Sequence, residues 1–303
     1  MLDLLLWILL PLCVGFGIRV QNPLQLRLIN QSLNYIVYLI LVLIGIELAQ
    51  VDNLGQELGF ILGVSCLFLC INAAFNVLMV MLIDWKFPLR LRVHEHSERP
   101  SLKHALMGSL KQIACVAVGF AMAKYAFADL TLPHKSISVA LALLLWCIGM
   151  QLRSSGISVK SVFFNRRALV VAAMVLFSSV LASVCLSWIL NIRLSQALAI
   201  NSGWGWYSLS GIIMTDAYGA VWGSVALVND LGREFLALAM IPILMMRTPT
   251  AAVALGGVTA LDFTLPTIQK SGGVEMVPLA ISFGFIMNVI SPILMAFFAH
   301  AKF

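Results

Sequence analysis

The sequence predicts an all-α polytopic membrane protein, from its composition and from the length of its apolar runs. Of its 303 residues, 61% are hydrophobic and only 11% are charged, whereas an average soluble domain carries about 25% charged residues. A membrane-spanning helix needs roughly 20 mostly apolar residues, and about eight runs approach or exceed that length. They are Leu2–Ile18, Leu33–Ala49, Leu58–Ile83, Ile113–Leu130, Ile137–Leu152, Ala168–Leu190, Ala220–Met246 and Met276–Phe298.

The loops between these runs are short, so we expect one integral membrane domain over 1–303. Residues 1–190 supply N-terminal helices, and residues 194–303 supply interrupted segments and core helices. Lys and Arg concentrate in three connections, whereas Val51–Glu57 carries two acids and no base. Because basic loops stay in the cytoplasm, both chain termini are predicted outside. The net charge of +6 comes from these loops and indicates orientation in a lipid bilayer. No nucleic-acid partner is expected. The basic connections are Gln21–Gln31 with its flanking Arg19, Lys86–Lys111 and Gln151–Arg167.

Two further stretches, Leu194–Gly219 and Thr248–Gly273, are apolar enough to enter the bilayer but are broken by Gly, Ser, Thr or Pro. Irregular backbone at membrane depth is tolerated only where it is buried in protein or lines a wet cavity. We therefore expect re-entrant hairpins or broken helices. If both stretches cross the bilayer fully, the protein has ten spans, and both termini remain outside.

The two stretches resemble each other weakly. Tyr207-Ser208-Leu209 followed by Ile212 matches Phe263-Thr264-Leu265 followed by Ile268, and one long apolar run follows each stretch. If each unit is one hairpin plus one span, the two units lie antiparallel. Inverted repeats with paired interruptions are typical of secondary transporters and indicate a binding site near the midplane; chance similarity is the alternative.

Charged residues inside apolar runs are the candidate site, because a carboxylate at mid-bilayer costs at least roughly 2.5–3.5 kcal/mol. Glu47 lies about one turn from the outer end of the second run. It is predicted to be a cation or proton site facing a cavity, and the alternative is an interfacial acid that reaches the headgroups. Asp216 follows the first interruption and is expected in an exposed turn.

The segment Asn229–Glu234, with sequence NDLGRE, places one amide and three charges in the middle of the seventh run. Asp230 and Arg233 can pair at i,i+3, and Asp230 and Glu234 share a face at i,i+4. One arginine cannot fully neutralise two carboxylates, so one acid remains to bind a cation or a proton. The alternative is a self-contained structural ion pair. The predicted substrate- or proton-binding residues here are Asn229, Asp230, Arg233 and Glu234.

Asp262 sits in the second interrupted stretch, where a side chain and freed carbonyls could coordinate a cation; equally, it could cap a half-helix. Aromatic and polar residues at the interruptions could form a substrate cage, because an aromatic face attracts an ammonium group. Interfacial anchoring is the alternative for the aromatic residues. The predicted cage residues are Asn201, Ser202, Trp204, Tyr207, Ser208 and Thr264.

Several function classes lack support in the sequence. It contains no GxxxxGK[ST], HExxH or GxSxG motif, so no nucleotide-driven pump and no enzyme is expected. The six cysteines lie in apolar runs without a CxxC pair, so we expect no metal site, and no cofactor is implied. A metal-cation/proton antiporter and a channel remain alternatives, and a homo-oligomer stays open.

Taken together, NDLGRE, NSGWGWYSLSG (Asn201–Gly211) and DFTLP (Asp262–Pro266) resemble the LysO family of L-lysine exporters, and the likeness covers essentially the whole chain. The resemblance implies a bacterial inner-membrane exporter of L-lysine with both termini outside. It also implies functional intramembrane acids at Glu47, within GIEL, and at Glu234. The family pattern has Asp where this chain has Glu47, which keeps the charge and lengthens the side chain by one methylene. Lysine/proton antiport through these two acids is the mechanism we expect.

Overall fold

The computed structural model describes residues 10–11, 13–49, 54–87, 111, 114–126, 136–154 and 165–301, and every regular element among them is helical. The predicted run before Leu10 and most of the two longer basic loops lie outside the described residues. In the described part, four helices are long and apolar enough to cross a membrane, and three shorter apolar helices accompany them. The all-helical polytopic class is therefore confirmed. The four long apolar segments are Leu24–Ile46, Glu57–Lys86, Arg166–Leu190 and Val277–His300.

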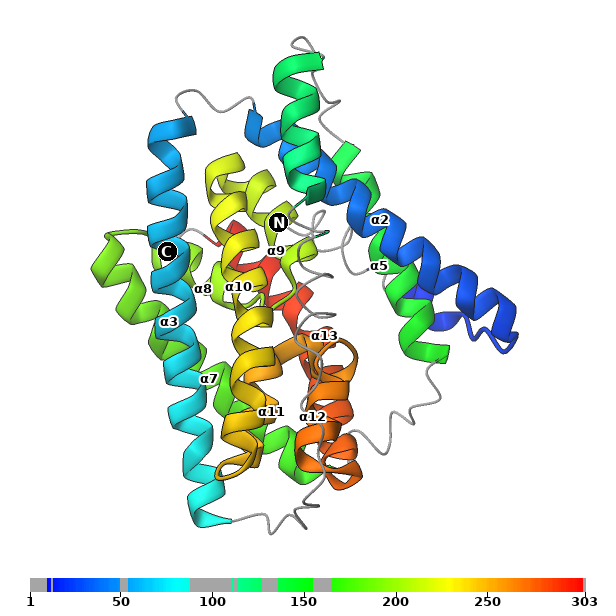
Figure 1. The fold of residues 1–303 in the computed structure, drawn as a ribbon, viewed down its shortest axis with the longest axis vertical. Helices are drawn as coiled ribbons and strands as arrows, with labels where there is room; N and C mark the ends of the chain where they lie inside the picture. The colour runs from blue at the N-terminus through cyan, green and yellow to red at the C-terminus, as the bar shows by residue number, and fades with distance from the viewer. Residues whose placement is uncertain are drawn as a thin grey trace.

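The N-terminal part contains the long helices α2 (Pro23–Ala49), α3 (Leu54–Lys86), α5 (Ser136–Ser154) and α7 (Arg166–Leu190). Helix α2 begins ten residues before the predicted run, so its first turns include the polar residues Arg27, Asn30 and Gln31. Figure 1 shows α2 and α5 together at one side of the molecule, splayed away from α3 and α10 (Ala220–Met245).

A close helix crossing holds α2 in place. A Cβ atom on Gly45 would overlap the carbonyl oxygen of Val116, and one on Gly119 would overlap that of Val42. Both contacts join α2 to the apolar helix Ala114–Tyr125. Small residues let helix backbones approach closely in membranes, so these two glycines fix the helix that carries Glu47.

Both interrupted stretches are broken where the sequence predicts. In the first, the segment Ser202–Trp206 separates two helices, and we call it the first break. In the second, Gly257–Thr264 separates two helices and contains one 3₁₀ turn, and we call it the second break. The elements are α8 (Leu194–Asn201), α9 (Tyr207–Tyr218), α11 (Pro249–Gly256), η2 (Gly257–Leu261), α12 (Leu265–Gly272), η3 (Val274–Met276) and α13 (Val277–His300).

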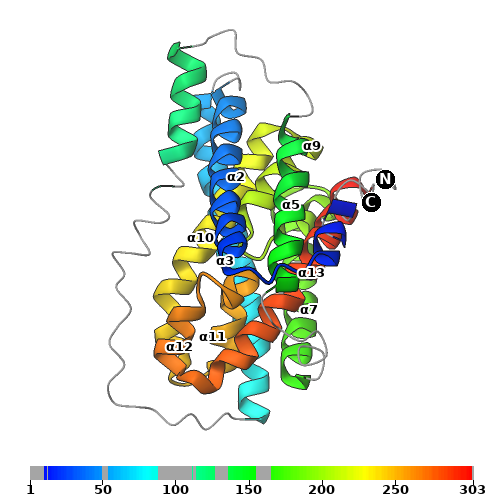
Figure 2. The ribbon, with the colours of Figure 1, turned by 90° about the vertical axis from the view of Figure 1, so that its right-hand side faces the viewer.

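The second stretch folds back on itself. Helices α11 and α12 lie side by side at one end of the molecule, below most of α10 (Figures 1 and 2). The chain thus enters and leaves at the same end, with the second break pointing into the helical bundle. This is the geometry of a hairpin. One long helix follows each interrupted stretch: α10 comes after the first and α13 after the second.

At that same end, α3, α7 and α11 are tied by one polar cluster. Arg167 forms an ion pair of 2.9 Å with Asp84, and its Nε donates to the Thr250 hydroxyl at 3.0 Å. The other Asp84 oxygen accepts from the main-chain amides of Thr250 and Ala251 at 3.0 and 3.1 Å. A carboxylate at a helix N-terminus is favourable, because free amides and the helix dipole meet it there. Asp84 therefore anchors the start of α11.

Candidate functional site

The two breaks touch each other through their backbones. The amide of Val258 donates to the carbonyl oxygen of Trp204 at 3.1 Å. Gly257 has φ of +59°, and a Cβ atom on it would overlap the Trp204 carbonyl group. Only glycine accepts both the backbone conformation and this close approach. The predicted interruptions thus form one structural unit.

Asp230 of α10 binds the first break. Its Oδ1 accepts from the main-chain amide of Gly205 and from the side-chain amide of Asn229, both at 3.1 Å. Its Oδ2 has no hydrogen-bond partner and lies where a Cβ atom on Gly203 would be. The side chain of Ser210 is a further neighbour of this carboxylate. Asp230 is 1% exposed, so its charge sits deep in the bundle against irregular backbone.

Arg233, one turn along α10, binds the second stretch. Its Nε donates to the carbonyl oxygen of Leu255 and its Nη2 to that of Ala254, both at 3.2 Å. These carbonyls end α11, where a cation is stabilised by the helix dipole and by unsatisfied acceptors. The ion pair expected between Asp230 and Arg233 is not formed; the ion pair among the described residues joins Arg167 to Asp84. The i,i+3 spacing permits pairing, but the carbonyls of α11 take the guanidinium.

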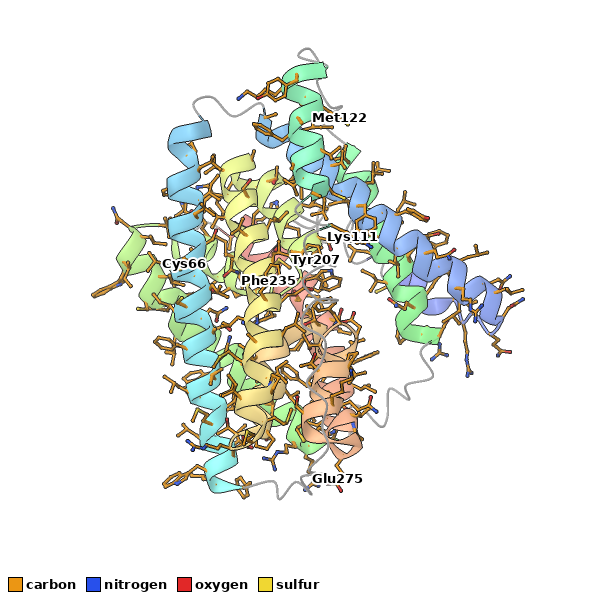
Figure 3. The ribbon with its side chains drawn as sticks, viewed as in Figure 1. Cys66, Lys111, Met122, Tyr207, Phe235 and Glu275 are labelled. Atoms are coloured by element: carbon orange, nitrogen blue, oxygen red, sulfur yellow. The ribbon has the colours of Figure 1, made fainter. Side chains whose placement is uncertain are left out.

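Glu234 is the carboxylate left without a partner. It is 4% exposed, and its Oε2 makes no hydrogen bond. Asp262 and Asp230 are near enough for their charges to act on it. Figure 3 labels the next residue, Phe235, near the middle of α10. A buried carboxylate with a free oxygen can accept a proton or a cationic group, and burying it empty and charged is costly.

Asp262 lies at the second break and is exposed, in contrast to Glu234. Its carboxylate accepts from the amide of Phe263, a short-range contact typical of turns. Helix α12 has Thr264 at its N-cap and no side-chain cap bond, so cation coordination and half-helix capping by Asp262 both stay predictions.

Helix α13 contributes two residues that the sequence analysis missed. The side-chain amide of Asn288 donates to the carbonyl oxygen of Val258 at 2.8 Å, in the second break. The hydroxyl of Ser291 donates to the carbonyl oxygen of Ser202 at 2.7 Å, in the first break. Both side chains are buried. Two polar residues three positions apart in a long apolar run are a signal that could have identified them.

A second missed group fixes the first break to α3 and α7. The indole N–H of Trp204 donates to the Ser179 hydroxyl at 2.9 Å. Ser179 lies within 3.1 Å of the Asn72 Oδ1 and 3.2 Å of the Asn76 Oδ1. Trp204 is 1% exposed, so it packs inside the bundle. Interfacial anchoring is therefore wrong for Trp204, because its indole N–H links the first break to α7.

The other predicted cage residues lie around the same breaks, mostly bonded to backbone. Ser202 donates to Leu198 O at 2.7 Å, and Thr264 donates to Thr259 O at 3.0 Å. Asn201 donates to Ser183 at 2.8 Å, whereas its buried Oδ1 has no partner. Ser208 is buried, and Tyr207 is half-buried at the start of α9. The cage interpretation stays a prediction.

The remaining acids lie elsewhere. Glu47 is in the last turn of α2, and its side chain is outside the described part of the structure. Asp216 is exposed in the last turn of α9, in helix where a turn was expected. The structure thus gathers Asn229, Asp230, Arg233, Glu234 and Asp262 around the breaks.

Comparison with known proteins decides the family. A family model described as "Lysine exporter LysO" matches residues 113–299. The lysine exporter LysO of Escherichia coli (strain K12) is 41% identical over 295 residues, covering 97% of this chain and 98% of that protein. This chain belongs to the LysO lysine exporter family. A putative lysine exporter of Haemophilus influenzae is 41% identical over 187 residues, covering 62% of this chain and 96% of the relative.

Membership in the LysO family places the protein among membrane transporters. The range matched by the LysO family model contains both breaks, α10 and α13, whereas α2 and α3 precede it. The contacts between the breaks, α10 and α13 therefore lie within the range matched by the family model. No solved structure matches this chain.

Proposed function

We propose that this protein is a secondary active exporter of L-lysine and close cationic analogues, working as a lysine/proton antiporter in the bacterial inner membrane. The single observation that carries the proposal is Glu234, a buried carboxylate whose Oε2 lacks a hydrogen-bond partner. Such a group can bind a substrate ammonium or a proton, but not both at once. Competition of this kind is what couples two opposite fluxes. Glu47 is the second acid that we assign to the pathway.

The charge balance favours exchange for a proton. Lysine carries a net positive charge at neutral pH, and moving one charge outward against an inside-negative potential costs about 2.3 kcal/mol per 100 mV. One inward proton for each exported lysine cancels the net charge movement. A carboxylate that is protonated on one side and binds lysine on the other links the two steps.

Lysine is favoured over a metal cation as the cargo. The curated relatives are named for lysine export. A metal-cation/proton antiporter would use the same acids, so the two functions need a direct comparison.

Binding to the purified protein distinguishes these functions. Titration with a panel of amino acids, sodium and divalent cations should give saturable binding of lysine, weaker binding of neutral amino acids, and no competition by the metal cations. The matched variants are Glu234→Gln, which should abolish lysine binding, and Glu275→Gln, which changes an exposed acid and should bind lysine normally. Tight binding of a metal cation with none of lysine would reject lysine as the cargo.

The orientation that we propose puts both termini outside, with α11 and α12 entering from the cytoplasm. The basic loops support this, because Lys86 ends α3 and Arg166 begins α7 at the end where α11 starts. Reporter fusions at Thr215 and Thr248 test it. Thr215 outside and Thr248 inside is expected, and the reverse placement would replace the hairpins with crossings.

A further inference from the structure

Helices α10 and α13 each contact both interrupted stretches, and the contacting residues follow the same order along the two helices. Asp230 binds the break that precedes its own helix, through Gly205. Arg233, three positions later, binds the other stretch, through Leu255 and Ala254. One helix thus reaches both interrupted stretches with two residues on neighbouring turns.

Helix α13 repeats this order. Asn288 binds the break that precedes α13, through Val258 at 2.8 Å. Ser291, three positions later, binds the other break, through Ser202 at 2.7 Å. The spacing and the order of partners match those of Asp230 and Arg233. This correspondence is what an inverted repeat of one hairpin plus one helix produces, and it is independent of the weak sequence match between the two stretches.

The two helices differ in chemistry. The α10 residues are charged, and unpartnered Glu234 lies next to Arg233. The α13 residues are neutral, and each donates a hydrogen bond to a main-chain carbonyl. The contacts made by α10 therefore depend on the protonation and cation occupancy of the site, because those change the net charge beside Arg233. The contacts made by α13 do not depend on them.

We propose that Asn288 and Ser291 are positioning residues that hold the two breaks together throughout transport, as the neutral counterparts of Asp230 and Arg233. They set the geometry of the binding site without contributing charge to it. The bond from Val258 to Trp204 carries the constraint from one break to the other, so loosening either α13 contact loosens both breaks. The effect on lysine affinity rests on the proposed function; the effect on the breaks does not.

Hydrogen exchange on the purified protein, followed peptide by peptide, tests the structural claim without any substrate. Asn288→Ala and Ser291→Ala should each increase exchange in both breaks, including the break that the changed residue does not touch. Ser291→Thr keeps the hydroxyl and should restore protection. The matched control is Ser224→Ala in α10, because this buried serine donates only to Ala220 of its own helix, at 2.8 Å. The control should exchange like the wild type.

Lysine binding supplies the functional readout. Losing one such hydrogen bond, worth about 1 kcal/mol, should raise the Kd for lysine roughly fivefold in Asn288→Ala and Ser291→Ala, with recovery in Ser291→Thr. Faster exchange confined to the contacted break, or no change in either break, would overturn the proposal. If the wild type binds no lysine, the proposed function fails, while the exchange data still decide the role of α13.

Discussion

The amide of Val258 donates a hydrogen bond of 3.1 Å to the carbonyl oxygen of Trp204, and this contact joins the two interrupted segments at the centre of the bundle. Trp204 adopts φ of +44° there, a left-handed conformation that costs about 1–3 kcal/mol for a bulky residue. The indole bond to Ser179 and the contact with Gly257 hold it in that conformation. The chain thus accepts local strain where the charged residues of α10 meet irregular backbone.

Gly203 gives the Asp230 carboxylate its space. A Cβ atom on Gly203 would overlap the Asp230 Oδ2, so Gly203→Ala should displace the first break and lower the free energy of unfolding by about 1–3 kcal/mol. Thermal unfolding of the detergent-solubilised protein measures this change. Gly63→Ala is the control, because nothing lies within 4 Å of a Cβ atom at that site. Equal stability of the two variants would show that the first break tolerates the added methyl group.

Arg233 stabilises the end of α11 and balances buried acids. Arg233→Ala removes donors from two carbonyls and leaves Asp230 and Glu234 without the adjacent positive charge. Each buried polar group left without its hydrogen-bond partner typically costs about 1–3 kcal/mol, and two carbonyls are affected, so we expect a large drop in melting temperature and poor recovery of folded protein. Arg247→Ala, at an exposed position after α10, should behave like the wild type. A melting temperature near that of Arg247→Ala would contradict this role for Arg233.

The Asp84–Arg167 ion pair anchors the start of α11. Arg167→Ala breaks a contact of 2.9 Å to an acid whose side chain is only 3% exposed, and it also removes the donor to Thr250. Because Asp84 keeps the two α11 amides, we expect an intermediate loss of about 1–3 kcal/mol. Denaturant or thermal titration of the variant measures it. Arg166→Ala changes the exposed neighbouring residue and should cost little. An equal loss in both variants would contradict the anchoring role of Arg167.

Local patterns predicted much of this fold. The helix interruptions are predictable because Gly, Ser and Thr stand out within apolar runs. In the structure the helices of Leu194–Gly219 and Thr248–Gly273 are interrupted at segments that contain such residues. The cluster Asn229–Glu234 was equally visible, because charge inside an apolar run needs a reason. Counting two carboxylates against one arginine predicts that one acid lacks a partner; in the structure Arg233 binds main-chain carbonyls instead of either acid, and Asp230 and Glu234 each keep one oxygen without a hydrogen bond.

The partners of these residues were not predictable, because they depend on which distant segments meet. The spacing of Asp230 and Arg233 indicated an ion pair, whereas packing brings the end of α11 to the guanidinium. Asn288 and Asp84 were missed for the same reason. The polar side chains stand out in apolar helices, but the role of each comes from a contact with a half-helix or break elsewhere in the chain.

The most direct test of the account is lysine flux driven by a pH gradient in proteoliposomes, compared between the wild type and Glu234→Gln. The wild-type protein should move lysine against its gradient when protons flow the other way. Glu234→Gln keeps the shape of the side chain but cannot carry charge or a titrating proton, so its flux should fall at least about tenfold, as expected when a buried ammonium loses its carboxylate partner. The account is contradicted if the pH gradient drives no lysine flux in the wild type, or if Glu234→Gln retains full flux.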